Sequence, residues 1–522
     1  MNNSESSQES QTWQRLSPLS IIFFVGRFLT SLIKDALPSM APLAVVIFSS
    51  DNKLGMTSTI GIGLLALLLV GSFLQYWFFK FKQQDGKVLI NDGVFKKNHR
   101  VIQFDRIQNI NILQPLYFKP FSLVTLQIET AGAKGNEADL AGVSREYAEQ
   151  LRNQVLQQQE LFVRHSSEIN HEKSNQPRII AKASLKDLVK YGVSSNGIFW
   201  FFVFLAPVFG LADDFLEKIF SKEDFVKLTE FVGGGTMGDV IILLAMLLAT
   251  IILMFTFSIL GAILRYFHYQ LSLSQLSQNQ QITNKPISNP SKSTLKRSSG
   301  LLTKYEESLK LQKIQTLINQ SNFIGRWLNV NNLTLGQVST GQNNAKNKKS
   351  LFIIPARTDS ESAELQKVVF DDAPEQIETK GINRRYVYKT IILKILLPSL
   401  LICLTIYFNH GPAWVLSLPL VFSLLMFPLV IKRWKAYQYG MSEGYGMFQR
   451  GLFGFRHVLF PLFKVQRAEV TQSPIQRRRD LATLKIFLAS NRLQMQYIPM
   501  DEALGWLKVI SGQIEINKRA WY

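Results

Sequence analysis

Long uncharged apolar runs alternate with polar, strand-like stretches along this chain. Three of the runs contain no charged residue at all: Met56–Phe79, Val240–Leu264 and Gly411–Ile431. A helix of about 20 residues crosses the ~30 Å hydrocarbon core of a bilayer, and each run is at least that long. Each of these runs therefore predicts a membrane-spanning helix.

Three further apolar segments are weaker. Tyr191–Ala212 is uncharged, Thr390–Phe408 is interrupted by Lys394, and Leu16–Ser49 is broken by several charges. Charges inside spans are often functional. Lys394 lies only five residues after Lys389, so we expect its side chain to snorkel to the membrane surface.

The segment Leu16–Ser49 has two interpretations. Leu16–Leu37 carries three charges and Ala36–Ser49 is short for a span, which fits an interfacial amphipathic helix followed by a short span. A single tilted helix with snorkelling Arg27 and Lys34 fits equally well. Counting one span here, the chain has six spans in three pairs, and each pair returns the chain to the same side.

An internal repeat appears when the three polar segments are aligned. Each contains a glycine and, at the same interval in all three, a basic residue followed by an aliphatic residue and Gln. A second Gln comes next, and a Thr-Leu pair follows at a nearly constant interval from the glycine. The glycines are Gly93, Gly300 and Gly451, the basic residues Arg106, Lys313 and Lys464, the second glutamines Gln114, Gln320 and Gln472, and the threonines Thr125, Thr334 and Thr483. This agreement predicts a threefold repeat, whose units we call the first, second and third copies.

Each copy is predicted to be mostly β. Apolar and polar residues alternate in Val88–Ile90, Ile107–Ile112 and Leu123–Ile128, and the repeated glycine between strand-like runs predicts a turn with positive φ. The second Gln of each copy is expected to satisfy backbone groups at a strand end. Helical stretches close the copies at Ser144–Gln158, Glu361–Phe370 and Asp501–Ile510. A strand-rich unit closed by one helix is the outline of a pleckstrin-homology (PH) fold.

The expected fold class is an α+β membrane protein with about six transmembrane helices in three pairs, each pair followed by a cytoplasmic PH-like β domain with a C-terminal helix. The expected boundaries are a disordered N-terminus at 1–14, helix pairs at 15–80, 181–267 and 384–432, PH-like domains at 81–160, 268–371 and 433–518, and linkers at 161–180 and 372–383. The second domain has a Ser-, Asn- and Gln-rich insertion at 272–299, which predicts a flexible loop.

Several motifs resemble a known family. The third copy contains Arg450-Gly451-Leu452-Phe453 and Leu462-Phe463-Lys464-Val465-Gln466, and the first contains Asp105-Arg106-Ile107-Gln108-Asn109-Ile110. Over about residues 15 to 515 the chain is similar to the YdbS/YdbT-like bacterial PH (bPH2) membrane proteins. The resemblance implies a fold and a location rather than a role. The second copy departs from the pattern through its insertion and its shorter spacing from Lys313 to Gln320.

Charge fixes the expected orientation. The chain has 58 Lys+Arg and 38 Asp+Glu, a net charge of +20. Basic residues flank the polar segments, whereas the opposite loop Asp213–Asp239 has seven acids and three lysines. By the positive-inside rule the N-terminus and PH-like domains are expected in the cytoplasm of a bacterial cell, beneath its inner membrane. Met1–Gln11 has no basic n-region, so no signal peptide is expected, and the single cysteine, Cys403, excludes a disulfide-stapled protein.

No catalytic constellation emerges, so no enzyme activity, cofactor or metal is expected. Gly61–Ala66 matches a dinucleotide fingerprint but lies inside a predicted span. His165, Glu168, His171 and Glu172 lie in a polar linker, where a solvated tether is the simpler interpretation than a metal site. No nucleic-acid motif with aromatic platforms accompanies the basic charge.

The basic clusters are the best functional signal. Residues 432–522 hold 15 Lys+Arg and 6 Asp+Glu, and each surface cation near an anionic leaflet contributes ~1 kcal/mol. The candidate contacts with anionic lipid or a protein partner are Lys96, Lys97, Arg100, Arg106, Lys464, Arg467, Arg477, Arg478 and Arg479. The alternative is that this charge only reflects membrane topology.

The sequence thus predicts a non-enzymatic membrane protein whose PH-like domains contact lipid head groups or a protein partner, as a scaffold. The alternative is a transport or export component linked to envelope stress or peptide resistance. Against transport, the predicted spans contain few polar residues, whereas substrate paths usually show them.

Overall fold

The computed structural model describes residues 12–31, 53–94, 96–130, 136–164, 178–195, 235–275, 293–337, 352–408, 413–442 and 444–516. Several predictions fall outside these residues: the short apolar run 36–49, the segment 196–212, the acidic loop before 235, the His and Glu cluster at 165–172, and residues 276–292 of the insertion. The predicted flexible loop at 272–299 is wrong at both ends, where 272–275 and 293–299 belong to strands of the second copy. The described chain divides into two compact units, the first formed by residues up to Lys173 with 296–298 and 302–308, and the second by the rest.

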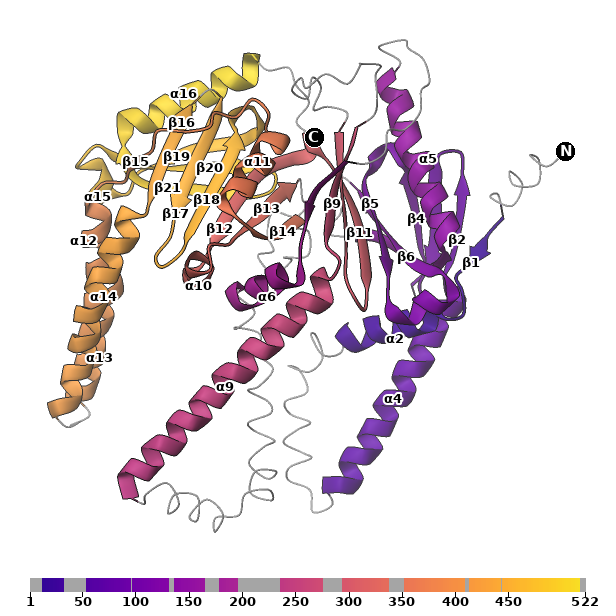
Figure 1. The fold of residues 1–522 in the computed structure, drawn as a ribbon, viewed down its shortest axis with the longest axis horizontal. Coiled ribbons are helices and arrows are strands. Elements are labelled where there is room, and N and C mark those ends of the chain that lie inside the picture. Colours follow the sequence, from indigo (N-terminus) through magenta and orange to yellow (C-terminus); the bar gives the residue numbers. More distant parts are fainter. Residues whose placement is uncertain are drawn as a thin grey trace. The chain divides into compact units, whose positions relative to one another are not determined.

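Four described helices are long and apolar enough to cross a membrane (Figure 1). The first is Ser58–Phe78, part of α4 (Lys53–Phe78), and the second is Leu248–Tyr266, part of α9 (Gly235–Tyr266). The third, Arg385–Phe408, consists of α12 (Arg385–Ile391), the π-helical η8 (Ile392–Leu396) and α13 (Leu397–Phe408). The fourth, Ser417–Lys435, is α14, which follows η9 (Ala413–Leu416). Four of the expected spans are therefore present, and the count of six in three pairs stays a prediction.

The first helix is short. Helix α2 (Ser20–Ser31) has 12 residues, too few to cross a bilayer. It packs beside α4, where a Cβ on Gly71 would meet the Phe28 ring at 3.6 Å, and the Phe24 ring lies 6.1 Å from that of Phe79, the residue after α4. Both interpretations of Leu16–Ser49 stay predictions, because Lys34 and the residues that follow lie outside the described chain.

The first copy is a PH-like domain. One sheet has the order β1-β2-β3-β4, and a second sheet contains β7-β6-β5, with helix α5 after it. The bounds are β1 (Gln14–Arg15), β2 (Lys80–Gln84), β3 (Lys87–Asp92), β4 (Asn98–Gln103), η3 (Phe104–Arg106), β5 (Ile107–Gln114), η4 (Leu116–Phe121), β6 (Leu123–Thr130), β7 (Asn136–Ser144) and α5 (Arg145–Arg164). The predicted strand residues Val88, Ile90, Leu126 and Ile128 are fully buried in its core, so apolar alternation sets which face each strand buries.

The second and third copies repeat this order of elements. The second contains β8 (Arg178–Lys182), α6 (Leu185–Ser194), β9 (Gln270–Gln275), β10 (Ser293–Ser299), β11 (Lys304–Lys310), η6 (Leu311–Lys313), β12 (Ile314–Ser321), α10 (Phe323–Trp327), β13 (Asn331–Gln337), β14 (Phe352–Arg357) and α11 (Asp359–Val369). The third contains β15 (Lys380–Gly381), β16 (Gln438–Ser442), β17 (Tyr445–Arg450), β18 (Phe455–Pro461), η10 (Leu462–Lys464), β19 (Val465–Thr471), α15 (Pro474–Arg477), β20 (Leu481–Leu488), β21 (Arg492–Pro499) and α16 (Met500–Ile516).

The repeated glycine has two structural roles. Gly93 and Gly300 have φ values of 104° and 114°, so the predicted positive-φ turn is confirmed there. The prediction is wrong for Gly451, which is absent from the positive-φ residues described. A Cβ at Gly451 would instead collide with the carbonyl oxygen of Gly454. Close approach of the turn's own backbone, rather than φ, requires glycine in the third copy.

The predicted role of the second glutamine is confirmed in two copies. The side-chain amides of Gln114 and Gln472 donate to the carbonyls of Leu123 and Leu481, at 3.3 and 3.0 Å. In the second copy Ser321, not Gln320, occupies this position, and its hydroxyl donates to the Val330 carbonyl at 2.8 Å. Each bond joins a residue to the carbonyl nine positions later, so the spacing is regular and only the side chain differs.

Neighbouring copies share their sheets. In the second unit β12 of the second copy pairs antiparallel with β18 of the third, with Ile318 opposite Val458. The resulting sheet has the order β14-β13-β12-β18-β17-β16-β15. In the first unit β5 of the first copy pairs in the same way with β11, where Tyr305 lies opposite Leu113. The last half of one copy thus continues into the first half of the next.

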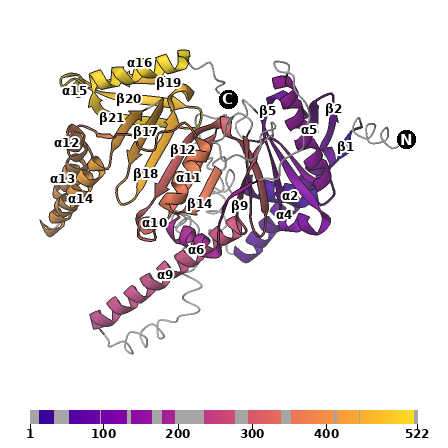
Figure 2. The ribbon, with the colours of Figure 1, turned by 45° about the horizontal axis from the view of Figure 1, so that its top comes forward.

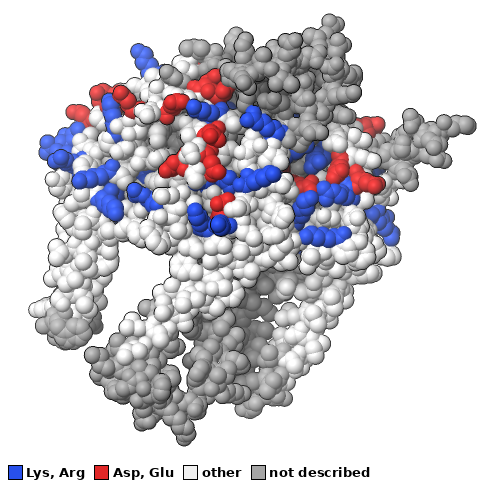
Figure 3. All heavy atoms as spheres, in the orientation of Figure 1, with Lys and Arg blue, Asp and Glu red and all other residues white. Residues whose placement is uncertain are grey.

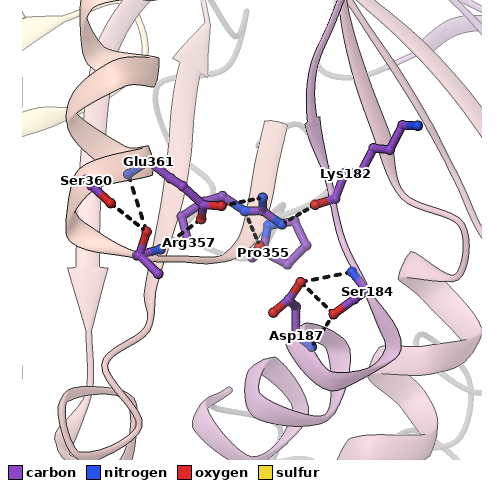
Figure 4. Close-up of polar contacts among 8 residues, drawn as sticks. Lys182, Ser184, Asp187, Pro355, Arg357, Ser360 and Glu361 are labelled. Carbon is purple, nitrogen blue, oxygen red and sulfur yellow. Dashed lines mark hydrogen bonds and ion pairs between the residues drawn. The ribbon is translucent and has the colours of Figure 1, made fainter.

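A buried arginine fixes the second copy to its membrane helices (Figure 4). The Arg357 guanidinium, at the end of β14, donates to the carbonyls of Lys182 at 2.9 Å and Pro355 at 3.0 Å. Lys182 ends β8, and Ser184 caps α6 through a reciprocal pair of bonds with Asp187. Helix α6 then packs against α9, so tightly that a Cβ on Gly192 would lie 2.6 Å from Cα of Ile259.

Candidate functional site: a basic pocket in the third copy

A cavity of about 440 Å³ lies where the third copy meets the ends of its membrane helices. Six cationic side chains line it: Lys389 of α12, Lys394 of η8, Arg433 of α14, Arg450 of β17, Arg456 of β18 and Arg492 of β21. No Asp or Glu is among the described residues that line it. We call this cavity the basic pocket.

The floor of the basic pocket is apolar and buried. Phe448, Val458 and Leu493 line it and are buried in the core of the third copy. Tyr437 also lines it and donates a hydrogen bond through its hydroxyl to the Gln494 carbonyl. Burial raises the pKa of Tyr437 to about 12, although Arg450 and Arg433 oppose this rise. The phenol is therefore a neutral donor at physiological pH.

Two arginines face each other inside the pocket. Arg450 and Arg456 are directly opposite partners in the β17–β18 ladder. Like charges in such a pair destabilise a sheet, and both burial and Arg450 lower the pKa of Arg456. The buried Nε of Arg456 has no hydrogen-bond partner among the described residues. A bound anion would relieve both the repulsion and the unsatisfied donor.

The helix that carries Lys394 changes its winding at this point. Residues Ile392–Leu396 form a π-helical turn, which ends just before Pro398. Proline lacks the N–H that would bond the Lys394 carbonyl and its ring clashes with that carbonyl, so the regular ladder is interrupted. The side chain of Lys394, which was predicted to snorkel to the membrane surface, lines the basic pocket.

The structure places the predicted contact residues in three different environments. Lys96, Lys97, Arg106 and Arg477–Arg479 are exposed. Arg100 pairs with Asp92, and Arg467 pairs with Glu469 and lies over the Phe487 ring. None of these residues is among those described as lining the basic pocket, so the structure does not gather the predicted set into one site.

Lys464 requires a correction. Its side chain is only 6% exposed, and its amine donates to the carbonyls of Gln312 and Ile314 at 2.5 and 2.6 Å. Both carbonyls belong to the second copy, next to the shared sheet. Lys464 therefore joins the copies, and a lipid head group cannot reach it. Its counterpart Arg106 looks the same in sequence but is exposed.

Sequence reasoning missed the basic pocket because its cations come from six elements that are distant along the chain. Lys389 and Arg433 are among the basic residues that flank the polar segments, which indicated only the orientation of the chain. The pairing of Arg450 with Arg456 was partly visible, since both flank the repeated glycine at Gly451. A turn at that glycine places its flanking residues opposite each other, and two arginines there were a usable signal.

Comparison with known proteins agrees with this architecture. The family model described as "Bacterial PH domain" matches residues 23–159 and 392–513. The first match begins in α2 and the second inside the candidate span Arg385–Phe408, and each ends in the C-terminal helix of a copy, α5 or α16. The chain is therefore a membrane protein with bacterial PH domains. The second copy, outside both matches, has the same order of elements.

Two curated relatives make the assignment more specific. The chain is 25% identical over 354 residues to the UPF0699 transmembrane protein YdbT of Bacillus subtilis (strain 168), a match that covers 65% of each chain. It is 26% identical over 136 residues to the UPF0699 transmembrane protein YdbS of the same organism, which covers 24% of this chain and 84% of YdbS. The chain is thus homologous to UPF0699 transmembrane proteins, and it spans just under two thirds of YdbT. No solved structure matches.

Proposed function

We propose that this protein binds the phosphate head group of an anionic phospholipid in the basic pocket, and so holds its PH-like domains against the cytoplasmic leaflet as a non-enzymatic scaffold. The observation that carries the proposal is the set of six cations, with no acid among the described lining residues, at the ends of two membrane helices. Basic pockets between helices at this depth suit lipid phosphates.

The second copy also supports a position at the leaflet. The side chain of Asn322 donates to the Ser194 carbonyl at 2.7 Å, and Ser258 of α9 donates to the Gly192 carbonyl at 2.7 Å. Ser258 lies eight residues before the end of α9, which is ~12 Å along the axis. Helix α10, which follows Asn322, therefore lies beside the membrane-spanning part of α9.

Helix α10 presents aromatic side chains at that level. Phe323 and Trp327 are 67% and 81% exposed. The Phe323 ring contacts Phe453 edge-to-face at 6.4 Å, and the Lys432 amine lies 4.9 Å from the centre of that second ring. Exposed aromatics beside cations are typical of the interface between head groups and acyl chains.

Membrane transport has less support. In each candidate span only 11% of the residues are buried inside the protein. The charged residues on the visible face lie over the β domains, and no charged residue is seen on the described parts of the projecting helices on that face (Figure 3). Scaffolding on a lipid surface uses these features, whereas a substrate path needs polar groups within the spans.

The test compares two double variants of the full chain in detergent. Arg450→Gln with Arg456→Gln removes two pocket cations, and Arg477→Gln with Arg478→Gln removes the same charge from an exposed site of the same domain. Binding of short-chain phosphatidylglycerol is measured by calorimetry, with phosphatidylcholine and inorganic phosphate as parallel ligands. We expect the pocket variant to lose about tenfold or more in affinity, as for two charge-assisted bonds, and the control to change little.

An equal loss of phosphatidylglycerol affinity in both variants would show that only net charge matters, which would contradict the proposal. Tight binding of inorganic phosphate alone, without preference for phosphatidylglycerol over phosphatidylcholine, would replace a lipid site by a free-phosphate site. Unchanged binding in the pocket variant would place the lipid elsewhere on the protein.

A further inference from the structure

Among the strands that end a sheet in the described chain, β4 and β19 differ from their counterparts in the other copies. In the first copy β4 ends the sheet β1-β2-β3-β4, and in the third copy β19 ends the sheet β19-β20-β21. Their repeat counterparts do not end a sheet in this way. The counterparts of β4 are β11 and β18, those of β19 are β5 and β12, and they pair as β5 with β11 and β12 with β18.

We propose that β19 of one molecule pairs antiparallel with β4 of a second molecule of this chain, so that the protein assembles head to tail. The two internal pairings supply the template, because each joins a β19-like strand to a β4-like strand. Strand edges with unpaired N–H and C=O groups are ready sites for such addition. A second copy of this chain is the partner whose edge has the matching geometry.

The internal pairings also fix the register. Lys304 opposite Gln114 and Phe455 opposite Ser321 are equivalent pairs in the two seams. Transferred by the repeat spacing, both seams place Lys97 opposite Gln472, and Asn98 opposite Thr471. The two seams give the same register independently, although the second copy differs by one residue in its Gln position.

This register brings complementary side chains together. It places Arg100 opposite Glu469, a cation facing an anion, and opposite charges across a sheet stabilise the pair. The buried Nε of Arg100 has no hydrogen-bond partner among the described residues. The next pair is apolar: Val101, whose side chain is 57% exposed on β4, would cover Ala468. Lys97, Arg100 and Arg467, predicted as lipid or partner contacts, then lie at or beside a protein interface.

The symmetry of this contact has a consequence for assembly. Joining two different edges is heterologous, and such contacts build rings when the rotation closes and open filaments when it does not. The seams between molecules would repeat the strand pairing of the seams within them, so an assembly of this kind is one continuous series of equivalent junctions.

The first experiment measures mass and charge dependence with the full chain in lipid nanodiscs and in detergent. We expect the wild type to form oligomers at micromolar concentration, and Glu469→Arg to convert them to monomers by setting like charges opposite Arg100. The double variant Arg100→Glu with Glu469→Arg restores the ion pair in reverse and is expected to restore the oligomers. The parent and both variants carry Asp92→Asn and Arg467→Gln, because these two residues pair with Arg100 and Glu469 within one chain. Rescue excludes the explanation that the single variant is merely misfolded.

A second experiment tests the register. Two differently tagged chains carry Cys403→Ser, one with Asn98→Cys and the other with Thr471→Cys, and are mixed under mild oxidation. We expect a cross-linked product between the two tags, and much less when Lys96→Cys replaces Asn98→Cys, because diagonal residues lie farther apart than direct partners. Phosphatidylglycerol binding, measured in parallel, reports on the pocket separately.

A wild type that is monomeric under both conditions would overturn the inference. Oligomers that persist in Glu469→Arg, or that cross-link equally in both registers, would show that the chains associate through another surface.

Discussion

Two basic residues at the same position of the repeat differ in burial. Arg106 is exposed, whereas Lys464 is buried against carbonyls of the preceding copy. The sequence motif is common to both, so it could not distinguish them. The difference arises because β18 acquires a neighbouring strand and β4 does not within the described chain. Charge alone was therefore a poor guide to function at this residue.

Replacing Lys464 by Met should destabilise the protein. The substitution leaves the carbonyls of Gln312 and Ile314 without their donor, and an unsatisfied buried group costs about 1–3 kcal/mol. The measurement is thermal or denaturant unfolding of the full chain in detergent. Arg106→Met is the matched control at the equivalent exposed site, where we expect a change within about 0.5 kcal/mol. Equal effects in the two variants would contradict the assigned role of Lys464.

The stability of the protein should also depend on pH through Lys464. Burial lowers the pKa of its amine to about 8, whereas an unfolded lysine has a pKa of ~10.4. Between these values the unfolded chain binds more protons, so stability rises with pH. From about pH 8 to about pH 10 the wild type should gain stability relative to Lys464→Met. A constant difference between the two proteins over this range would exclude the linkage.

At the scale of elements, the sequence predicted the four described spans and most of the strands. Uncharged runs of about 20 residues have few alternatives to a membrane helix, and strand alternation is set by one buried face. The basic pocket could not be predicted as a site, because its cations belong to α12, η8, α14, β17, β18 and β21. Helix α10 was missed for a different reason: five residues are too short for a periodic pattern.

Helix α10 should lie at the membrane interface. In a Cys403→Ser chain, a fluorescent label at Arg326→Cys should be quenched by phosphatidylcholine brominated in the upper acyl chain. The same label at Ser511→Cys, on α16, should not be quenched, since α16 lies on the opposite side of the β domain from α10 (Figures 1 and 2). Interfacial segments are buried ~5–10 Å into this region.

Two results would contradict this placement of α10. A label at position 326 that resists brominated lipid but is quenched by aqueous iodide would put α10 in water. A label shielded from both quenchers would put protein, rather than lipid, over Phe323 and Trp327.

At the scale of the whole molecule, the copies of the repeat are not independent domains. The sequence revealed three similar units. Pairing of β12 with β18 places the boundary between cores within a continuous sheet. A repeat in sequence gives no information about which strands pair across its boundary, since the same side-chain alternation serves either partner.

The isolated third domain, residues 435–522, should therefore not behave as a stable monomer. Its excision exposes the edge of β18, which carries Val458 and Phe460 and normally pairs with β12. We expect light scattering to detect self-association. A synthetic peptide of the β12 sequence Ile314–Ser321 should restore the monomer by adding the missing strand, whereas a scrambled peptide should not. A folded monomer without any peptide would contradict this expectation.

Shared sheets also constrain how such a chain can change length during evolution. A duplication or deletion that begins and ends at equivalent points of the repeat always rejoins a β12-like strand to a β18-like strand, so every seam stays complete. Recombination at unequal points would leave a β12-like or β18-like strand without its partner strand. The unit of inheritance in this architecture is then one seam together with one pair of membrane helices, and gene variants should differ by whole units of that kind.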